Sequence, residues 1–382
     1  MVILLPAIAE AEPLRLRGDA YAETSSPVGL VVLHGEDRLK PGVDAETVTW
    51  LGVRDTSGPA GDVLTLSVRL RDISTGSEVR AGRLLVSMGA VRPIHIDGAR
   101  GLVRVFGGTT VEAFGGFPVA RRFEYDTFDW ATGGRIGQSI GDVFAVGASY
   151  LQRRSDGRPA DEEAGADLMF TPRPWLSAVG RAAYDLESRG LTDVLASVGA
   201  HDKDVRGELF TTYRSPGRML PSTSLFSVLG DFSSTNVGGT GRWRAFPRLE
   251  LVATGSAQVQ ASDVGGQGLG RATLALDDDW DGTVGVEGRR VEVGHARWSG
   301  ARVIAGVPVS RRVRVSTELE LVVPDHPGTR PWLWPWALAA VSYRIGKAWD
   351  VAAGVEASSG PEDRSTLAGL ARLSFAFDRL ER

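Results

Sequence analysis

Cysteine is absent from this chain of 382 residues, lysine occurs at three positions and asparagine at only one. Without cysteine there is no disulfide framework and no thiolate ligand for a metal. Arginine and the carboxylates nearly balance, with a formal net charge of −4, so the sequence lacks the basic field that attracts nucleic acid. We expect no nucleic-acid partner, no metal and no cofactor.

Long hydrophobic runs are also missing. No window approaches the roughly 20 apolar residues that a membrane-spanning helix needs, and the mean hydropathy is close to neutral. These absences argue against a helical membrane protein. They leave a transmembrane β-barrel open, because barrel strands mix lipid-facing with lumen-facing residues and give a weak hydropathy signal.

The sequence does contain a recurring alternation of apolar and polar residues. In residues 64–71, 248–260 and 312–323, aliphatic residues or glycine mostly alternate with charged or hydroxylated ones. Successive side chains of a β-strand point to opposite sides. Each segment is therefore predicted to be a strand with one apolar face and one wet face.

Turn signals recur along the whole chain. They lie near residues 38–41, 74–77, 107–109, 140–142, 172–174, 202–204, 246–247, 278–282, 310–311 and 346–347. The spacing leaves room for two strands and a longer loop between neighbouring turns, as in an up-and-down meander with two different rims. Because lipid offers no hydrogen-bond partners, such a sheet must close.

We therefore predict an all-β fold, a closed up-and-down antiparallel transmembrane β-barrel of roughly 20–22 strands without a separate plug domain. The first strand, residues 14–23, should pair with the last. Residues 120–130 and 215–234 lack clean alternation. The second of these regions is expected to be a long outer loop, an inward-folded constriction or a short helix.

Aromatic residues gather at the predicted strand ends. Such girdles anchor a barrel at the two membrane interfaces, whereas a water-soluble β-propeller, the alternative, would bury its tryptophans in mid-strand. The predicted interface aromatics are Phe170, Trp175, Trp243, Phe246, Trp280, Tyr343 and Trp349 at one rim, and Trp298, Trp332, Trp334 and Trp336 at the other.

The end of the chain carries a more specific pattern. Gly369 is followed by Leu373, Phe375 and Phe377 on one face of a final strand. This resembles the C-terminal insertion signal of porin-like bacterial outer-membrane β-barrels, although residues 378–382 continue past the last aromatic. The resemblance implies an integral protein of the Gram-negative outer membrane, inserted by the barrel-insertion machinery and surrounded by outer-membrane lipid.

The first residues suggest export. Residues 1–12 hold a short apolar run and small-x-small patterns, like the end of a secretory signal peptide without its basic region. An ordinary apolar N-terminus is the alternative. We expect residues 13–382 to form a single transmembrane β-barrel domain.

The polar face of the predicted sheet would line the lumen. Rings of arginine and carboxylate select solutes by charge, although the same residues can merely pair across neighbouring strands. The candidate lumen-lining residues are Arg69, Arg71, Arg181, Asp185, Arg206, Glu208, Arg248, Glu250, Arg312, Arg314, Glu318, Glu320, Asp350, Glu356 and Arg372.

Three motifs imitate catalytic or binding sites. Residues 137–141 spell G-x-S-x-G, but strand character resumes after them where a nucleophile elbow needs a helix. Residues 277–282 begin like a calcium loop, yet its twelfth position is Gly288 where a glutamate is required; we interpret them as a polar turn, with a weak rim cation site as the alternative. Residues 266–270 lack the helix that a phosphate loop precedes. We predict no catalytic residue and no enzyme.

A wide polar lumen without a plug most simply predicts a water-filled, porin-like conduit for small polar solutes. One alternative is a structural barrel that anchors a trans-envelope assembly for secretion, adhesion or gliding motility. A membrane-embedded lipid hydrolase is a more distant alternative. A homo-oligomer or envelope-complex proteins are the expected partners.

Overall fold

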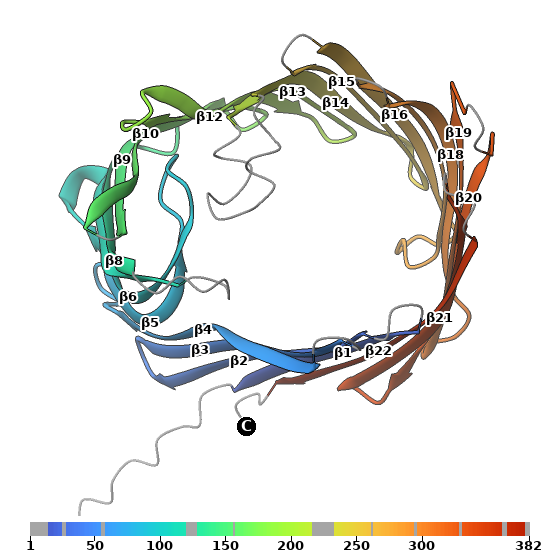
Figure 1. Ribbon diagram of the computed structural model, residues 1–382, viewed down its shortest axis with the longest axis horizontal. Helices are drawn as coiled ribbons and strands as arrows, with labels where there is room; N and C mark the ends of the chain where they lie inside the picture. Colours follow the sequence, from blue (N-terminus) through green and yellow to red (C-terminus); the bar gives the residue numbers. More distant parts are fainter. Residues whose placement is uncertain are drawn as a thin grey trace, which may run out of the picture.

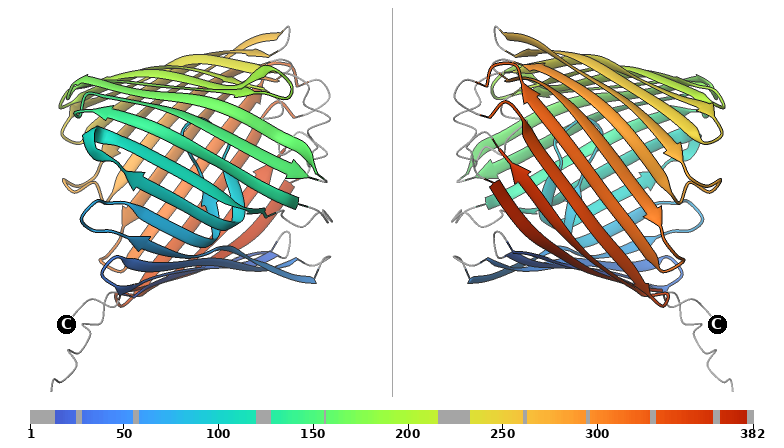
Figure 2. Two further views of the ribbon diagram at one scale, coloured as in Figure 1. Left: turned by 90° about the vertical axis from the view of Figure 1, so that its left-hand side faces the viewer. Right: turned by 90° about the vertical axis from the view of Figure 1, so that its right-hand side faces the viewer.

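The chain forms one closed antiparallel β-barrel (Figures 1 and 2). The computed structural model describes residues 14–24, 28–54, 58–119, 128–155, 157–215, 233–260, 263–293, 296–327, 331–360 and 365–378. Within these ranges the sheet has 22 strands. Each strand pairs with its neighbours in sequence, and β1 pairs with β22 from Arg15↔Asp378 to Glu23↔Leu370. The predicted all-β fold, the strand number and the pairing of first and last strands are confirmed.

The strands are long enough to cross a bilayer when tilted. Their bounds are β1 Arg15–Glu23, β2 Val28–Lys40, β3 Val43–Arg54, β4 Gly58–Arg71, β5 Glu78–Val86, β6 Ile94–Arg104, β7 Thr109–Pro118, β8 Phe128–Ile140, β9 Phe144–Ser155, β10 Arg158–Arg173, β11 Leu176–Asp185, β12 Gly190–His201, β13 Val205–Arg214, β14 Ser234–Phe246, β15 Leu249–Gln260, β16 Asp263–Ala275, β17 Thr283–Val293, β18 Ala296–Pro308, β19 Val313–Pro324, β20 Trp334–Ile345, β21 Trp349–Ser359 and β22 Ser365–Asp378.

Two rims follow from this order. The terminal rim carries the start of β1, the end of β22 and the connections at 41–42, 72–77, 105–108, 141–143, 174–175, 202–204, 247–248, 276–282, 309–312 and 346–348. The loop rim carries the remaining connections, among them 87–93 and 325–333. Every predicted turn falls at the terminal rim, within a few residues of a connection. The uncertain segments 120–127 and 216–232, and the predicted signal-peptide remnant 1–12, lie outside the described residues.

Helix is almost absent from the described residues. One 3₁₀ turn, η1 Phe106–Gly108, joins β6 to β7. No helix in the described part of the chain has the length and apolar character needed to span a membrane.

Glycines lie side by side on three neighbouring strands of the barrel. Gly82 of β5 pairs with Gly98 of β6, which in turn pairs with Gly116 of β7, so three glycines form a row across the sheet. Gly82 has a φ of 124°, and a Cβ at Gly98 would lie 2.2 Å from the carbonyl oxygen of Gly115. Only glycine tolerates such a backbone and such contact. We call this row the glycine crease.

Beyond the crease, the end of β5 and the start of β6 leave the wall. The β4–β5 ladder ends at Leu66↔Arg83, whereas β5 and β6 stay paired as far as Val86↔Ile94. Figure 1 shows this segment inside the ring, beside β8 to β10. We call residues 83–96 the inward hairpin.

The inward hairpin packs a small dry core against the inner wall. Its buried members are Leu84, Val86, Met88, Val91 and Ile96 from the hairpin, and Phe114, Ala131 and Leu151 from the wall, all exposed by 5% or less. At the hairpin tip, Ala90 lies against Gly165 of β10, where an added Cβ would come within 2.9 Å of the Ala90 Cβ. Burial of apolar surface, at about 25 cal/mol per Å², therefore holds the hairpin inside the barrel.

Candidate functional site

The wall of the lumen is the candidate functional site, and the inward hairpin identifies which face of the sheet is inner. The hairpin lies inside the ring and covers Phe114, Ala131 and Leu151, so these residues face the lumen (Figure 1). Directly paired residues of neighbouring strands share a face. Starting from these three residues, the register of each strand pair therefore tells which positions of the next strand are inner and which are outer, around the whole barrel.

The outer face is apolar. Along β4 it presents Leu66, Val68 and Leu70, and along β19 Leu319 and Leu321, all exposed in the isolated chain. Contiguous exposed apolar surface on this scale requires an apolar neighbour. In a closed barrel that neighbour is the hydrocarbon of a bilayer.

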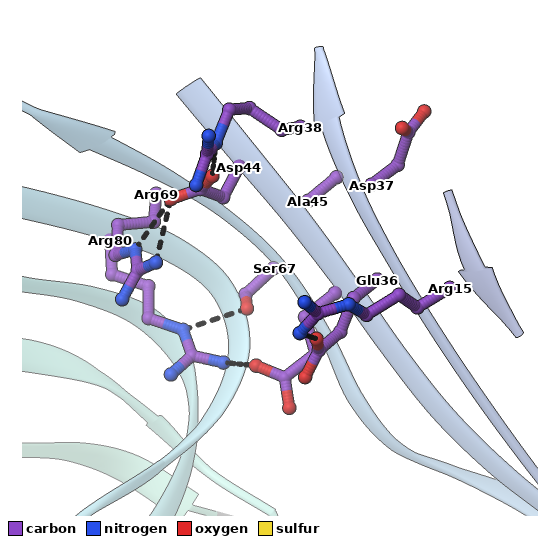
Figure 3. A pocket seen from close by; sticks show the side chains of 10 residues that line it. Arg15, Glu36, Asp37, Arg38, Asp44, Ala45, Ser67, Arg69 and Arg80 are labelled. Carbon is purple, nitrogen blue, oxygen red and sulfur yellow. Dashed lines mark hydrogen bonds and ion pairs between the residues drawn. The ribbon is translucent and has the colours of Figure 1, made fainter. Parts of the chain in front are cut away.

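The inner face is charged, and one polar hollow shows how its residues are held (Figure 3). This hollow of ≈ 250 Å³ lies against β1 to β5 near the terminal rim. Arg69 donates two hydrogen bonds to the Asp44 carboxylate, at 3.0 and 2.6 Å. Arg80 forms an ion pair with Glu46 and donates to the Ser67 hydroxyl at 2.8 Å.

Cross-strand ion pairs of this kind recur along the inner wall. Most are partly exposed to the lumen, so each adds little stability, typically up to about 1 kcal/mol. They instead fix the direction of each guanidinium in a fork geometry. Further pairs are Arg100–Glu112, Arg135–Asp167, Arg181–Asp193, Arg242–Glu250, Arg289–Glu320, Arg302–Glu318 and Arg372–Asp350.

The register places most of the predicted lumen-lining residues on the inner face. These are Arg69, Arg71, Arg181, Asp185, Arg206, Glu208, Glu250, Arg314, Glu318, Glu320, Asp350, Glu356 and Arg372. Many are the members of the ion pairs above, so cross-strand pairing and lumen lining coincide.

The other two predicted lining residues lie in connections of the terminal rim. Arg248 reaches Asp278 of the neighbouring connection at 2.8 Å. The backbone of Arg312 donates to the Ser310 hydroxyl at 3.2 Å within its own turn. Both residues therefore lie at the terminal rim of the barrel rather than along its wall.

At the terminal rim, aromatic side chains face outward from the strand ends. Phe170, Trp243, Tyr343 and Trp349 occupy outer positions of β10, β14, β20 and β21. Three further aromatics, Trp175, Phe246 and Trp280, lie in or beside the connections. This arrangement suits a membrane interface.

At the loop rim the tryptophans are arranged differently. Trp298 pairs with Pro324, Trp334 with Val322 and Trp336 with Glu320, and all three occupy inner positions. Trp336 donates its indole N–H to Glu356 at 2.7 Å. Position along the strand suggested a lipid interface for these residues, but strand parity decides the side and directs them into the lumen. Trp332 lies in the connection before β20 and is 68% exposed.

The inward hairpin is fastened by a buried ion pair that the sequence did not reveal. Arg92 at its tip donates from its backbone and its guanidinium to Glu163 of β10, each at 2.8 Å. It also donates to Asp161 at 2.8 Å. Glu163 is 0% exposed, and Thr192 adds a contact to it at 3.3 Å.

A second arginine ties the hairpin to β4. The Arg83 guanidinium donates to Asp97 at 2.8 Å, to Asp62 at 3.1 Å and to the carbonyl oxygen of Val63 at 3.1 Å. It thus bonds to β4 just beyond the point where the β4–β5 ladder ends.

The outer face becomes polar at the loop rim. Arg290, on the outer face of β17, donates to Glu292 at 2.5 Å and to Asp325 at 2.6 Å. Asp325 follows the end of β19, and the hydrogen bonds from Arg290 hold its pKa below the ordinary value. Because this charge cluster is exposed on the outer face, the apolar part of that face ends before it reaches the loop rim.

The last strand carries the predicted insertion residues. Leu373, Phe375 and Phe377 occupy outer positions of β22, and the Phe375 ring lies 5.3 Å from that of Trp349. The backbone N–H of Gly369 donates to the Thr24 hydroxyl at 2.7 Å, beside the β1–β22 pairing.

The motifs that imitate catalytic sites are turns and strands. Residues 137–140 end β8 and are followed by the connection at 141–143, without a helix. Asp277 accepts the backbone N–H groups of Asp281 and Gly282, each at 2.8 Å, and so shapes its own turn. Among the described residues, no group of three or more His, Asp or Glu is placed to hold a metal ion.

No protein-family model matches the sequence, and no curated protein matches it. The fold, however, is similar to solved barrels. The translocation pore of the P pilus usher PapC aligns with a TM-score of 0.55 and 9% identity, over 96% of this chain and 98% of the pore. The siderophore receptor PirA from Pseudomonas aeruginosa aligns with a TM-score of 0.62 and 10% identity, over 95% and 80%.

A third structure, the ferric enterobactin receptor PfeA, aligns with a TM-score of 0.64 and 8% identity, over 97% of this chain and 82% of the receptor. At these identities the likeness shows the fold. The chain has the fold of an outer-membrane β-barrel, as the pattern of its strands predicts.

Proposed function

We propose that this barrel is a water-filled, porin-like conduit for small polar solutes in the outer membrane. The main support is the contrast between an apolar outer face and an inner face lined with directed arginines and carboxylates. The inward hairpin leaves the wall and lies inside the ring (Figure 1). A barrel of this width encloses water unless something fills it.

Charge selection would arise from the paired arginines. Each inner ion pair presents an oriented dipole to a passing solute, and the hairpin narrows the route on the side of β8 to β10. Outer-membrane lipid would surround the barrel, the barrel-insertion machinery would assemble it, and residues 369–377 would be its recognition signal.

Planar-bilayer recording tests this proposal. The purified, heat-modifiable barrel should give discrete, ohmic current steps that scale with salt concentration. Absence of steps from correctly folded protein would contradict a conduit.

A structural barrel within an envelope assembly is the second candidate. Its support is the alignment with the translocation pore of the P pilus usher PapC over nearly the whole of both chains. An assembly barrel should co-purify with stable envelope partners after crosslinking in cells and should stay electrically silent without them. A lone or homo-oligomeric conducting barrel would favour the conduit.

A further inference from the structure

The ladder of the wall is interrupted beside the inward hairpin. β3 and β4 stay paired from Val43↔Leu70 to Arg54↔Gly58, whereas β4 and β5 are paired only from Arg71↔Glu78 to Leu66↔Arg83. The first half of β4, residues 58–65, therefore continues in the wall beyond the end of the β4–β5 ladder. We call the space between residues 58–65 of β4 and residues 84–86 of β5 the side opening.

The inward hairpin lies away from this half of β4. Its apolar side chains pack on Phe114, Ala131 and Leu151 of β7 to β9, and Arg92 at its tip bonds to Glu163 of β10 (Figure 1). β4 and β5 thus separate at the glycine crease, where β4 stays in the wall and β5 turns into the lumen. Neighbouring strands lie about 4.8 Å apart, so a strand that leaves the wall vacates the width of a small molecule.

The edge of β4 at the side opening is suited to stand without a strand beside it. Pro59 has no backbone N–H, and proline within a sheet is confined to edge strands, strand starts and bulges. The backbone N–H of Val63 donates to the Asp62 carboxylate at 2.8 Å, and the Val63 carbonyl oxygen accepts from the Arg83 guanidinium at 3.1 Å. Side chains thus occupy groups that an added strand would need, which favours an opening over the binding of a partner strand.

Apolar surface borders the side opening. Leu51 and Val53, on the outer face of β3 beside this edge, are 60% and 55% exposed, as suits contact with hydrocarbon. Inside the barrel, Leu85 is 61% exposed, on the face of the hairpin opposite the dry core. A hollow of ≈ 510 Å³ reaches Pro59 and Ala60 at the edge of β4, and the residues that line it across β1 to β4 are uncharged. The opening is therefore suited to apolar molecules.

We propose that small, uncharged apolar molecules leave the lumen for the bilayer through the side opening. Such a solute would enter the lumen from the loop rim, contact Leu85 and pass the edge of β4 at Pro59 and Ala60. Transfer of apolar surface from water into hydrocarbon is favourable, so the step needs no coupled source of energy. This route goes beyond the proposed conduit, which carries polar solutes along the barrel axis.

Uptake of N-phenyl-1-naphthylamine tests the route in cells that lack other porins and keep an intact lipopolysaccharide leaflet. This uncharged probe fluoresces in hydrocarbon, and lipopolysaccharide retards its entry. Cells that carry the barrel should take up the probe faster than cells without it. Ala60→Trp adds bulk at the edge of β4, and Leu85→Glu places a charge on the lumenal side of the opening. Each change should return the rate toward that of cells without the barrel.

Thr254→Trp is the matched control. Thr254 lies on the inner face of β15, where the ladders to β14 and β16 are both intact, so the change adds the same bulk to the lumen away from the opening. It should leave probe uptake unchanged. Uptake that persists in the Ala60→Trp and Leu85→Glu variants would reflect general damage to the membrane and would overturn the proposal. An equal loss in the Thr254→Trp control would also overturn it.

Crosslinking identifies what lies at the side opening and does not depend on transport. Because the chain has no cysteine, Ala60→Cys can carry a single benzophenone in the folded barrel in lipid nanodiscs. Residue 60 is an inner position, yet its benzophenone should crosslink to lipid, whereas Thr254→Cys with the same label should not. Crosslinks from residue 60 only to protein would mean that a polypeptide segment fills the opening. That result, or the absence of lipid crosslinks, would contradict the route.

Planar-bilayer recordings distinguish this inference from the conduit itself. Current steps without faster probe uptake would overturn the side route and leave the conduit standing. Probe uptake that Ala60→Trp blocks, in a barrel that gives no current steps, would support the side route and contradict the conduit.

Discussion

Two sectors of the same inner wall are built in opposite ways. Under the inward hairpin, the wall of β7 to β10 carries Phe114 and Leu151 and excludes water, and its Glu163 is fully buried. Further round the barrel, β14 and β15 carry pairs such as Arg242–Glu250, whose arginine side chain is 54% exposed. The same alternating pattern thus encodes a packed interior on one side and a wet surface on the other.

The difference shows what holds the hairpin. A buried charge that loses its partner destabilises the protein by several kcal/mol. When a pair that faces water is broken, water solvates the remaining charge and the loss is small. The covered sector should therefore respond strongly to single substitutions, and the open sector weakly.

The largest effect is expected for Arg92→Ala. It removes the guanidinium that Glu163 and Asp161 share. Asp161 keeps its ion pair with Arg153, but the fully buried Glu163 loses its bonds to Arg92, which should destabilise the docked hairpin by about 3–5 kcal/mol. Single-channel recordings should show a noisier and larger current, and the connection at 87–93 should become sensitive to protease. An unchanged current with unchanged protease resistance would mean that the dry core alone holds the hairpin.

Leu84→Ala compares two faces of one strand. Leu84 is 1% exposed and its neighbour Leu85 is 61% exposed. Leu84→Ala should lower stability by about 2–5 kcal/mol, seen as a lower temperature of the gel-mobility shift. Leu85→Ala is the matched control and should shift that temperature far less. Similar shifts for the two variants would contradict the assignment of Leu84 to the packed face and of Leu85 to the exposed face.

A disulfide can fix the covered sector in place. Ala90→Cys with Gly165→Cys joins two positions whose Cβ atoms would lie 2.9 Å apart, so a modest backbone shift allows the bond. Because the chain has no other cysteine, pairing is unambiguous. The bond should add about 2–4 kcal/mol and quieten the current of the Arg92→Ala variant, and reduction should restore the noise.

The smallest effect is expected in the open sector. Arg242→Ala removes a partly exposed pair with Glu250 and should cost at most about 1 kcal/mol, with the hairpin undisturbed. Reversal potentials in a salt gradient should nevertheless shift toward cation preference, because one fixed positive charge leaves the lumen. A loss as large as that of Arg92→Ala would erase the distinction between the two sectors.

The architecture was accessible from the sequence because strand alternation and turn spacing are local signals. Residues 248–260 and 312–323 form strands as predicted, and residues 14–23 meet the end of the chain. Pairing of a first and last strand follows from lipid alone, since an open edge cannot remain in hydrocarbon.

The inward hairpin could not be read in the same way. Leu84, Leu85 and Val86 are apolar on both faces, and Gly82, Gly98 and Gly116 recur without an evident period. Alternation identifies which residues of a strand share a face. It does not show that another segment, such as the inward hairpin, lies inside the barrel and covers that face. The register that aligns the three glycines is a tertiary property.

The lumenal tryptophans show the same limit. Trp298, Trp334 and Trp336 lie near strand ends in the sequence, which suggests an interface, but the side they take depends on strand parity. Alternation counted along β18 from Val303 places Trp298 on the inner face, whereas Trp334 and Trp336 are placed there only by the register of β20 against β19. A girdle prediction therefore needs register as well as position.

The glycine crease also constrains the order of biogenesis. The inward hairpin belongs to the first third of the chain, while the junction of β1 with β22 requires both ends. A hairpin that must lie inside a ring is most easily placed while the ring is still an open ribbon. We expect the inward hairpin to dock against β8 to β10 first, while the sheet is still open, and β1 and β22 to pair last.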